Sequence, residues 1–140
     1  MLKVTCAIIV QKNKILITQR ALDSDHPLQW EFPGGKIKHG ERAEDCIKRE
    51  IHEELEIEIE ILKTMISVIY NYGFKKIELI PFLCSKKTGA VKLNDRIDFN
   101  WDEWNNLEKL NFAEADLKLI QQMANRQMLH KYVGEKINNT

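Results

Sequence analysis

The stretch from residue 35 to residue 57, GKIKHGERAEDCIKREIHEELEI, decides the fold of this chain. It predicts a helix over 41–55, because apolar residues recur there at helical spacing and form one stripe. The stripe consists of Ala43, Ile47, Ile51 and Leu55. Glu50, Glu53 and Glu54 are three and four positions apart, so the helix brings their carboxylates together at the border of the stripe. The acids are therefore expected where the helix meets the rest of the domain.

Three carboxylates in so small a patch repel one another. At about 5 Å and an effective dielectric near 20, each pair costs on the order of 3 kcal/mol. A hard divalent cation such as Mg²⁺, which prefers carboxylate oxygens, is the obvious compensating charge. The alternative is a solvated charged face on which Arg49 pairs with neighbouring acids. Gly34 and Gly35 favour the metal site, because glycines let the backbone approach a ligand. Glu41 has a second interpretation as an acid favoured by the helix dipole.

The bulk composition is that of one folded domain. The chain has 140 residues, 44% hydrophobic and 30% charged, which suits a single core. Its 21 basic and 21 acidic side chains give a formal charge of zero, so no overall field recruits nucleic acid or an anionic membrane. Three separated cysteines without a CxxC pair indicate a reducing cytosol. The apolar start is too short for a membrane span and lacks a signal-peptide pattern, so we expect a cytoplasmic protein.

Two rounds of strands followed by a helix predict an α/β (α+β) fold with a mixed sheet between helices. Strands are expected at 2–10, 15–19, 30–32, 57–70 and 75–85, and helices at 41–55, 101–107 and 113–128. Turns are expected at 12–14 and 71–74, and a loop at 21–29. A single domain is predicted over residues 1–129, followed by a frayed tail over 130–140.

The complete pattern resembles the Nudix signature, G-x5-E-x7-R-E-U-x-E-E-x-G-U, in which U is an aliphatic residue. The matching positions are Gly35, Glu41, Arg49, Glu50, Ile51, Glu53, Glu54 and Ile57. Glu56 departs from the signature, because a glycine usually stands there and ends the helix in a left-handed conformation. A glutamate at that backbone angle costs about 1 kcal/mol. The departure concerns the helix end and removes no metal ligand.

The resemblance extends over most of the chain. Residues 17–21 (ITQRA) and 30–37 (WEFPGGKI) look like the MutT-type branch, which includes mutator nucleotide pyrophosphohydrolases and CTP pyrophosphohydrolases. Residues 111–116 (NFAEAD) resemble the start of the second long helix of these enzymes. The resemblance implies the Nudix fold and hydrolysis of a nucleoside diphosphate linked to a further group.

The family pattern implies that Glu50, Glu53, Glu54 and the Gly35 carbonyl hold Mg²⁺ or Mn²⁺. By the same resemblance, Arg49 orients Glu50, and Glu41 supports the ligands or binds a further metal. Relatives add an acid from a later loop, for which Asp95 is the candidate and Asp98 the weaker one; a plain turn aspartate is the alternative. The general base is Glu50, Glu53 or that later acid, and the number of metal ions stays open.

The expected substrate contacts lie on either side of the glycine pair. Arg20 and Lys36 are candidates for the phosphates, against a plain surface role. Phe32 is a candidate for stacking on the base, as is Trp30, although either ring suits a core equally well. Asp116 aligns with the residue that contacts the base edge in the MutT branch. Ionised, it accepts from a cytosine amine; protonated, it faces a purine carbonyl. His26, in the loop, is a weaker candidate.

The sequence therefore predicts a metal-dependent nucleoside triphosphate pyrophosphohydrolase that releases a nucleoside monophosphate and pyrophosphate. Its substrate is either an oxidised guanine nucleotide, as in nucleotide pool sanitation, or a cytosine nucleotide such as CTP, dCTP or 5-methyl-dCTP. Other readings are a Nudix hydrolase of nucleotide sugars or dinucleoside polyphosphates, an isoprenoid isomerase, or a non-catalytic nucleotide sensor. The expected partner is the nucleotide alone, without a nucleic-acid polymer or membrane, and the protein is a monomer or homodimer.

Overall fold

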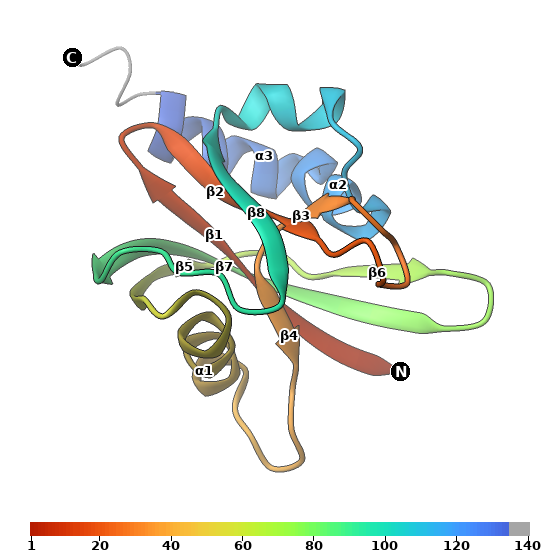
Figure 1. Cartoon of the computed structure of the whole chain (residues 1–140). Helices are drawn as coiled ribbons and strands as arrows, with labels where there is room; N and C mark the ends of the chain where they lie inside the picture. The colour runs from red at the N-terminus through yellow and green to blue at the C-terminus, as the bar shows by residue number, and fades with distance from the viewer. Residues whose placement is uncertain (135–140) are drawn as a thin grey trace.

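Strand β1 (Leu2–Gln11) forms the centre of the structure, because its side chains alternate between two hydrophobic cores. Ala7 and Ile9 belong to one core, while Cys6 and Ile8 belong to the other. The computed structural model describes residues 1–134 and gathers eight strands into one sheet around β1 (Figure 1). None of the helices in this described part is long and apolar enough to cross a membrane.

The elements form two groups of four strands, each followed by helical segments. They are β1, β2 (Lys14–Arg20), β3 (Trp30–Glu31), β4 (Gly34–Lys36), α1 (Ala43–Leu55), β5 (Glu58–Thr64), β6 (Val68–Asn71), β7 (Lys76–Thr88), β8 (Arg96–Asp102), the 3₁₀ helix η1 (Trp104–Lys109), α2 (Glu114–Gln121), α3 (Met123–Leu129) and the π-helical turn η2 (His130–Gly134). The sheet is mixed, since β1 pairs in parallel with β7 while its other partners are antiparallel.

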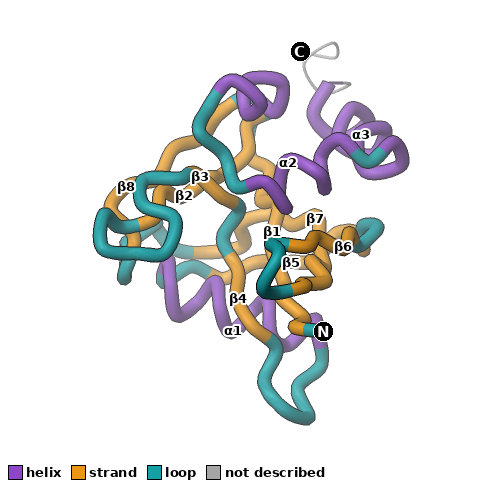
Figure 2. Tube along the Cα trace, turned by 90° about the vertical axis from the view of Figure 1, so that its right-hand side faces the viewer, coloured by secondary structure: helices purple, strands orange, loops and turns teal. Residues whose placement is uncertain are grey.

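Helices cover both faces of this sheet. Helix α1 lies on one face and α2 and α3 lie on the opposite face, as Figures 1 and 2 both show. The core under α1 includes Ile47, Ile51 and Leu55, which are the predicted stripe. The core on the other side includes Leu119 and Ile120 of α2. The predicted arrangement of a mixed sheet between helices is confirmed.

Strands β2 and β4 pair with different parts of the same edge of β1, and this arrangement positions the glycine pair. Strand β2 pairs with β1 at Val10 and Gln11, whereas β4 pairs with residues 4–6 nearer the start of the strand. Between them, the Ala7 amide donates to the Pro33 carbonyl at 2.8 Å. Gly34 and Gly35 therefore belong to a short strand of their own, beyond the extended piece expected at 30–32. This strand faces α1 and holds the backbone of the glycines beside the acidic helix.

Several predicted boundaries are corrected by the structure. Helix α1 begins at Ala43, so Glu41 precedes the helix and is not part of its first turn. The helix ends at Leu55, and Glu56 takes the left-handed conformation with φ of 54°, as the signature glycine would. The hairpin turns at 12–14 and 71–74 are found where expected. The expected strand over 57–70 is two strands, β5 and β6.

The largest correction concerns residues 96–109. A helix over 101–107 was predicted, but β8 continues through Asp102 and a 3₁₀ helix starts only at Trp104. Strand β8 exists because it pairs antiparallel with β2 along most of its length. The helix expected over 113–128 is also divided, because Gln122 has an extended ψ of 126° and caps α3 with its side chain. Of the tail predicted to fray, His130–Gly134 continues as a helical turn, and 135–140 lie outside the described residues.

Candidate active site

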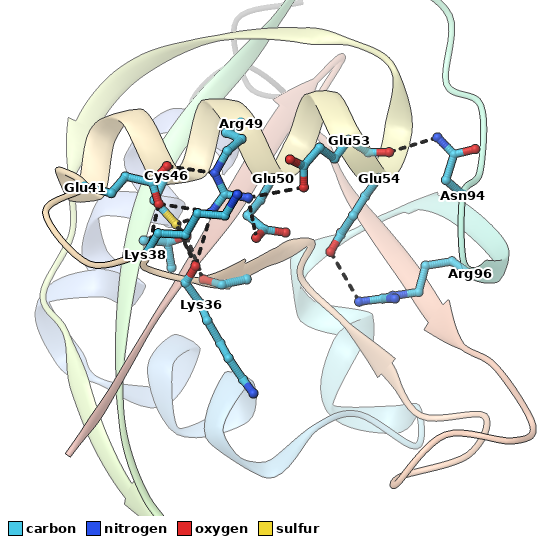
Figure 3. Close-up of polar contacts among 12 residues, drawn as sticks. Lys36, Lys38, Glu41, Cys46, Arg49, Glu50, Glu53, Glu54, Asn94 and Arg96 are labelled. Carbon is cyan, nitrogen blue, oxygen red and sulfur yellow. Dashed lines mark hydrogen bonds and ion pairs between the residues drawn. The ribbon is translucent and has the colours of Figure 1, made fainter.

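Arg49 of α1 lies at the centre of the acidic patch and contacts three of its carboxylates (Figure 3). Its Nε is 2.7 Å from Glu41, and its Nη1 is 2.9 Å from Glu50 and 3.2 Å from Glu53. These hydrogen bonds, with Glu41 the strongest influence, raise the pKa of the guanidinium above its ordinary value. Arg49 therefore neutralises part of the negative charge that the helix spacing concentrates.

Glu41 acts as an anchor for Arg49 from outside the helix. Both of its oxygens accept from the guanidinium, and Oε1 also accepts the Lys38 amide at 3.0 Å. The Arg49 hydrogen bonds, followed by the Lys38 amide, lower the pKa of Glu41 to about 2. Glu41 is thus held ionised and directed at Arg49.

Glu54 points away from Arg49 toward a second arginine, Arg96 of β8 (Figure 3). The segment before β8 is hydrogen-bonded to the end of α1. For example, the backbone N–H of Asn94 donates to the Glu54 carbonyl at 2.9 Å. This contact brings Arg96 Nη2 to 3.4 Å from Glu54 and 3.1 Å from Glu31. Burial of Glu54 raises its pKa to about 8 despite Arg96, and its Oε2 is buried without a hydrogen-bond partner in the described part of the chain. Such an oxygen is suited to a cation.

The Gly35 position leaves no room for a side chain. A Cβ placed there would lie 2.3 Å from Cδ of Glu50 and within 2.6 Å of both its oxygens. A Cβ at Gly34 would lie 2.0 Å from the Thr5 carbonyl oxygen. The two glycines are therefore required by close approach, the first to strand β1 and the second to the carboxylate of Glu50.

An open cleft of about 840 Å³ runs from this acidic end across the sheet. It brings together many of the residues predicted from the sequence. Those that line it are Arg20, His26, Phe32, Gly35, Lys36, Glu50, Glu54 and Asp116. Glu41, Arg49 and Glu53 are not among the lining residues; they surround the acidic end from the side of α1. The cleft therefore has an acidic end beside Glu50 and Glu54 and a second end beside Asp116, which we call the organic end.

The organic end is built around Asp116, which is 6% exposed. Its Oδ2 accepts the Phe32 amide at 2.8 Å. Burial, followed by the nearby charge of Glu31, raises the pKa of Asp116 to about 8, although the Phe32 amide and Arg20 oppose this. Near neutral pH the carboxyl group is therefore largely protonated.

The other predicted substrate residues differ in their surroundings. Phe32 lines the cleft but is 3% exposed and packs edge-to-face on Phe112 at 5.1 Å. The side chain of Trp30 packs against the core, and its backbone forms an isolated parallel β-bridge with Phe112. Trp30 does not line the cleft. Arg20 pairs with Glu31 at 3.3 Å, while Lys36 is exposed. Phe32 thus supplies both a wall of the cleft and a part of the core.

The loop acid predicted at Asp95 lies away from the cleft. Asp95 is exposed, has a positive φ of 64° and is not a lining residue, and Asp98 is exposed on β8. Arg96, between them, faces the cleft instead. Arg96 and Glu31 are residues that sequence reasoning missed. The available signal was the alternation of polar and apolar residues over 96–102, which indicates a strand with one face toward the cleft.

The donor set at the acidic end suits a divalent cation in its chemistry. In residues 1–134 no three acidic, histidine or cysteine side chains converge on one point, because Arg49 draws Glu50 and Glu53 while Arg96 draws Glu54. The buried Glu54 oxygen without a partner and the Glu50 carboxylate against Gly35 nevertheless present oxygen ligands.

Comparisons with known proteins agree with this geometry. The NUDIX domain family model matches residues 1–128. An 8-oxo-dGTP diphosphatase of Buchnera aphidicola subsp. Schizaphis graminum is 33% identical over 118 residues, which cover 84% of this chain and 88% of that protein. The CTP pyrophosphohydrolase of Escherichia coli is 29% identical over 121 residues, covering 86% and 90% respectively. The solution structure of the E. coli ORF135 protein is similar, with a TM-score of 0.80 and 30% identity. The match covers 90% of this chain and 91% of that chain.

Proposed function

The chain belongs to the Nudix family and is a Nudix hydrolase, and from this premise we propose that it hydrolyses (deoxy)nucleoside triphosphates to a monophosphate and pyrophosphate. The signature resemblance found in the sequence is confirmed by the family match. Nudix hydrolases generally depend on a divalent metal. The proposal concerns the substrate, the residues that bind it and the residues that hold the metal.

The acidic end of the cleft would hold the metal through Glu50, Glu53, Glu54 and the Gly35 carbonyl. When bound, Mg²⁺ or Mn²⁺ supplies charge neutralisation at the phosphate oxygens and activates the attacking water. Arg49 keeps Glu50 and Glu53 oriented, and Glu41 keeps Arg49 in place. These side chains position the phosphate bond, which is where most of the acceleration in phosphate hydrolysis arises.

The observation that carries the proposal is the continuous cleft between the carboxylates and Asp116. Its volume of about 840 Å³ is within the range of small-molecule sites and suits a nucleotide. Arg20 and Lys36 line it and offer positive charge to phosphates. A nucleotide placed in this cleft has its phosphates at the metal end and its base against Asp116 and Phe32.

The environment of Asp116 favours an oxidised guanine base over cytosine. Its Oδ2 accepts the Phe32 amide, so a proton on the carboxyl group resides on Oδ1. A protonated Oδ1 donates to a carbonyl such as O6 of guanine, whereas a cytosine amine requires an acceptor there. The raised pKa of about 8 for Asp116, caused mainly by burial, supports the protonated form at neutral pH. The carboxyl group thus favours a guanine base over cytosine, and the similarity to 8-oxo-dGTP diphosphatases leads us to place 8-oxo-dGTP first and cytosine triphosphates second.

A pyrophosphate-release screen with Mg²⁺ or Mn²⁺ tests the proposal. The panel contains 8-oxo-dGTP, dGTP, CTP, dCTP and 5-methyl-dCTP, with a nucleotide sugar and a dinucleoside polyphosphate as other classes. Turnover of 8-oxo-dGTP at the highest kcat/KM is the expected result. If no triphosphate is turned over, the substrate class is wrong, and binding without turnover indicates a nucleotide sensor.

The substitution Asp116→Asn separates the two base classes. An asparagine accepts the Phe32 amide with its oxygen and presents a permanent donor, as protonated Asp116 does. If the base is an oxidised guanine, kcat/KM is expected to stay within about threefold of the original. Two results together contradict the assignment of the base. One is a fall of roughly tenfold or more in the kcat/KM of Asp116→Asn for 8-oxo-dGTP, and the other is a preference of the original protein for cytosine substrates.

The substitution Glu53→Gln tests the role of the carboxylate helix. It removes one ligand charge and is expected to lower kcat by at least about a hundredfold. Glu58→Gln is the matched control, because Glu58 is 58% exposed, Glu53 is 53% exposed and each has one nitrogen partner within 3.2 Å, His52 for Glu58 and Arg49 for Glu53. Steady-state kinetics of both variants give the answer. A Glu53 variant with the full rate refutes its place among the ligands.

A further inference from the structure

The Thr5 hydroxyl lies directly beneath the carbonyl of Gly35. Thr5 is 0% exposed, and its Oγ1 donates to the Gly35 oxygen at 3.1 Å. The same Oγ1 is 3.2 Å from Sγ of Cys46, which is also fully buried. Either atom can donate in this contact, since the thiol has one proton and the Lys36 and Gly35 carbonyls are also within its reach. These three residues form a small polar cluster between the sheet and α1, next to the Glu50 carboxylate.

Three separate elements meet at this cluster. The antiparallel register of β1 and β4 places Gly35 opposite Thr5. Cys46 comes from α1, one helical turn before Glu50. The Cys46 thiol also lies 3.4 Å from the Lys36 carbonyl oxygen and 3.7 Å from that of Gly35. The cluster thus fixes the glycine strand against the helix that carries the carboxylates.

We propose that Thr5, assisted by Cys46, is a positioning residue that fixes the Gly35 carbonyl relative to Glu50 for metal binding. This inference rests on the proposed function, in which that carbonyl is a metal ligand. The Gly35 oxygen accepts the Thr5 hydroxyl on the side of β1, so a metal ion would have to approach this oxygen from its remaining open side, next to Glu50. Hydrogen bonds that orient metal ligands from behind are typically worth about 10–100-fold in metal affinity.

Close packing makes this support necessary. Gly35 has no side chain that could hold its peptide in place, and Glu50 lies against its Cα side. The ladder with β1 holds the Gly35 peptide in the sheet, and the Thr5 hydroxyl adds a second, side-chain constraint on the carbonyl oxygen itself. A purely structural role for Thr5, as a partner for one more buried carbonyl, predicts lower stability without a selective loss of metal affinity.

The test compares two buried threonines on neighbouring strands. Thr5→Val removes the hydroxyl and keeps the shape of the side chain. Thr18→Val is the matched control, because Thr18 is also 0% exposed and its hydroxyl has no partner among residues 1–134. Mn²⁺ affinity of the nucleotide-free protein is measured by electron paramagnetic resonance, beside kcat, KM and thermal unfolding.

Thr5→Val is expected to raise the Mn²⁺ dissociation constant by about tenfold and to lower kcat at limiting metal, with the nucleotide KM at saturating metal nearly unchanged. Thr5→Ser, which keeps the hydroxyl, is expected to restore Mn²⁺ affinity to within about threefold. Thr18→Val is expected to bind Mn²⁺ as the original protein does. Cys46→Ala serves as a second variant if Thr5→Val does not fold, with an expected loss of about threefold.

Two results overturn the inference. One is a folded Thr5→Val protein, or Cys46→Ala in its place, that binds Mn²⁺ normally; the other is an equal loss of affinity in Thr18→Val. Glu54→Gln separates this failure from that of the proposed function. If Glu54→Gln weakens Mn²⁺ binding while Thr5→Val does not, only the positioning role is wrong. If Glu50→Gln and Glu54→Gln both bind Mn²⁺ normally, the proposed metal site itself is wrong, and the role of Thr5 is overturned with it.

Discussion

Gly35 packs directly against the carboxylate of Glu50, and this contact makes Gly35→Ala informative. The added Cβ would lie 2.3 Å from Cδ of Glu50, so the side chain must move. We expect kcat to fall by roughly tenfold or more, because a small misplacement of a ligand is costly. Steady-state kinetics beside thermal unfolding measure it. An alanine variant with normal kcat would show that the position of Glu50 is not critical.

The left-handed Glu56 predicts a stabilising substitution. A glutamate with φ of 54° is strained relative to glycine, which adopts this angle freely. Glu56→Gly is therefore expected to raise the free energy of unfolding by about 1 kcal/mol, measured in urea. This value applies if the substitution leaves Leu55 buried and the end of the helix unchanged. A less stable glycine variant would mean that the Asn94 contact at 3.4 Å to Glu56 outweighs the strain.

At the residue scale, spacing within one helix was predictable and contacts between distant segments were not. The positions of Glu50, Glu53 and Glu54 follow from helical geometry alone. Arg96 reaches Glu54 only because the chain folds back from β8, 42 residues later. Thr5 and Cys46 read as ordinary core residues, since nothing local reveals that they meet at Gly35. Their roles depend on tertiary structure.

At the scale of elements, Asn125 joins α3 to the connection between β5 and β6. Its buried amide accepts from the Ile66 N–H and donates to the Ile66 carbonyl, both at 2.8 Å, and donates to the Leu119 carbonyl at 3.2 Å. Asn125→Ala leaves these groups without partners, so we expect a loss of about 2–4 kcal/mol in the free energy of unfolding. Asn105→Ala, at an exposed position, is the control and is expected to change it by under about 0.5 kcal/mol. Equal urea midpoints for the two variants would contradict this role.

Elements with a regular apolar period could be predicted from the sequence, whereas elements and boundaries with weaker local signals could not. Helix α1 and the central strands were predicted because their apolar spacing is regular. Strand β8 was missed although Ile97, Phe99 and Trp101 alternate with polar residues. Its pairing with β2 decides the outcome, and no local pattern reveals that partner. The break at Gln122 is likewise a tertiary effect, because α3 turns to place Asn125 against Ile66.

For the whole molecule, two buried acids predict how stability depends on pH. Burial raises the pKa of Glu54 and of Asp116 to about 8, above their ordinary values of 4.5 and 3.8. Between about pH 5 and 8 the folded state therefore holds protons that the unfolded state releases, and stability falls as pH rises. The steepest expected slope is about 1.4 kcal/mol per pH unit for each group.

Urea unfolding in a chelator at pH 5.5, 6.5 and 7.5 measures this slope. Mg²⁺ is expected to reduce the part due to Glu54, because the cation stabilises the ionised carboxylate. Asp116→Asn is expected to remove the other part, since the asparagine does not titrate. Glu41, whose pKa is lowered to about 2 by Arg49 and the Lys38 amide, contributes only in more acidic solution. Stability that increases over this pH range would contradict both assignments.

The parallel pairing of β1 with β7 also has a consequence for how the protein is made. Leu2 pairs with Ile77 and Val10 with Ser85, so the central ladder joins segments separated by most of the chain. Such non-local contacts slow folding, because a long loop must close before they form. During synthesis the whole Nudix signature leaves the ribosome before β7 can support it. A fragment of residues 1–60, free of the ribosome, is thus expected to bind no more manganese than a scrambled peptide, even though it already contains every proposed ligand.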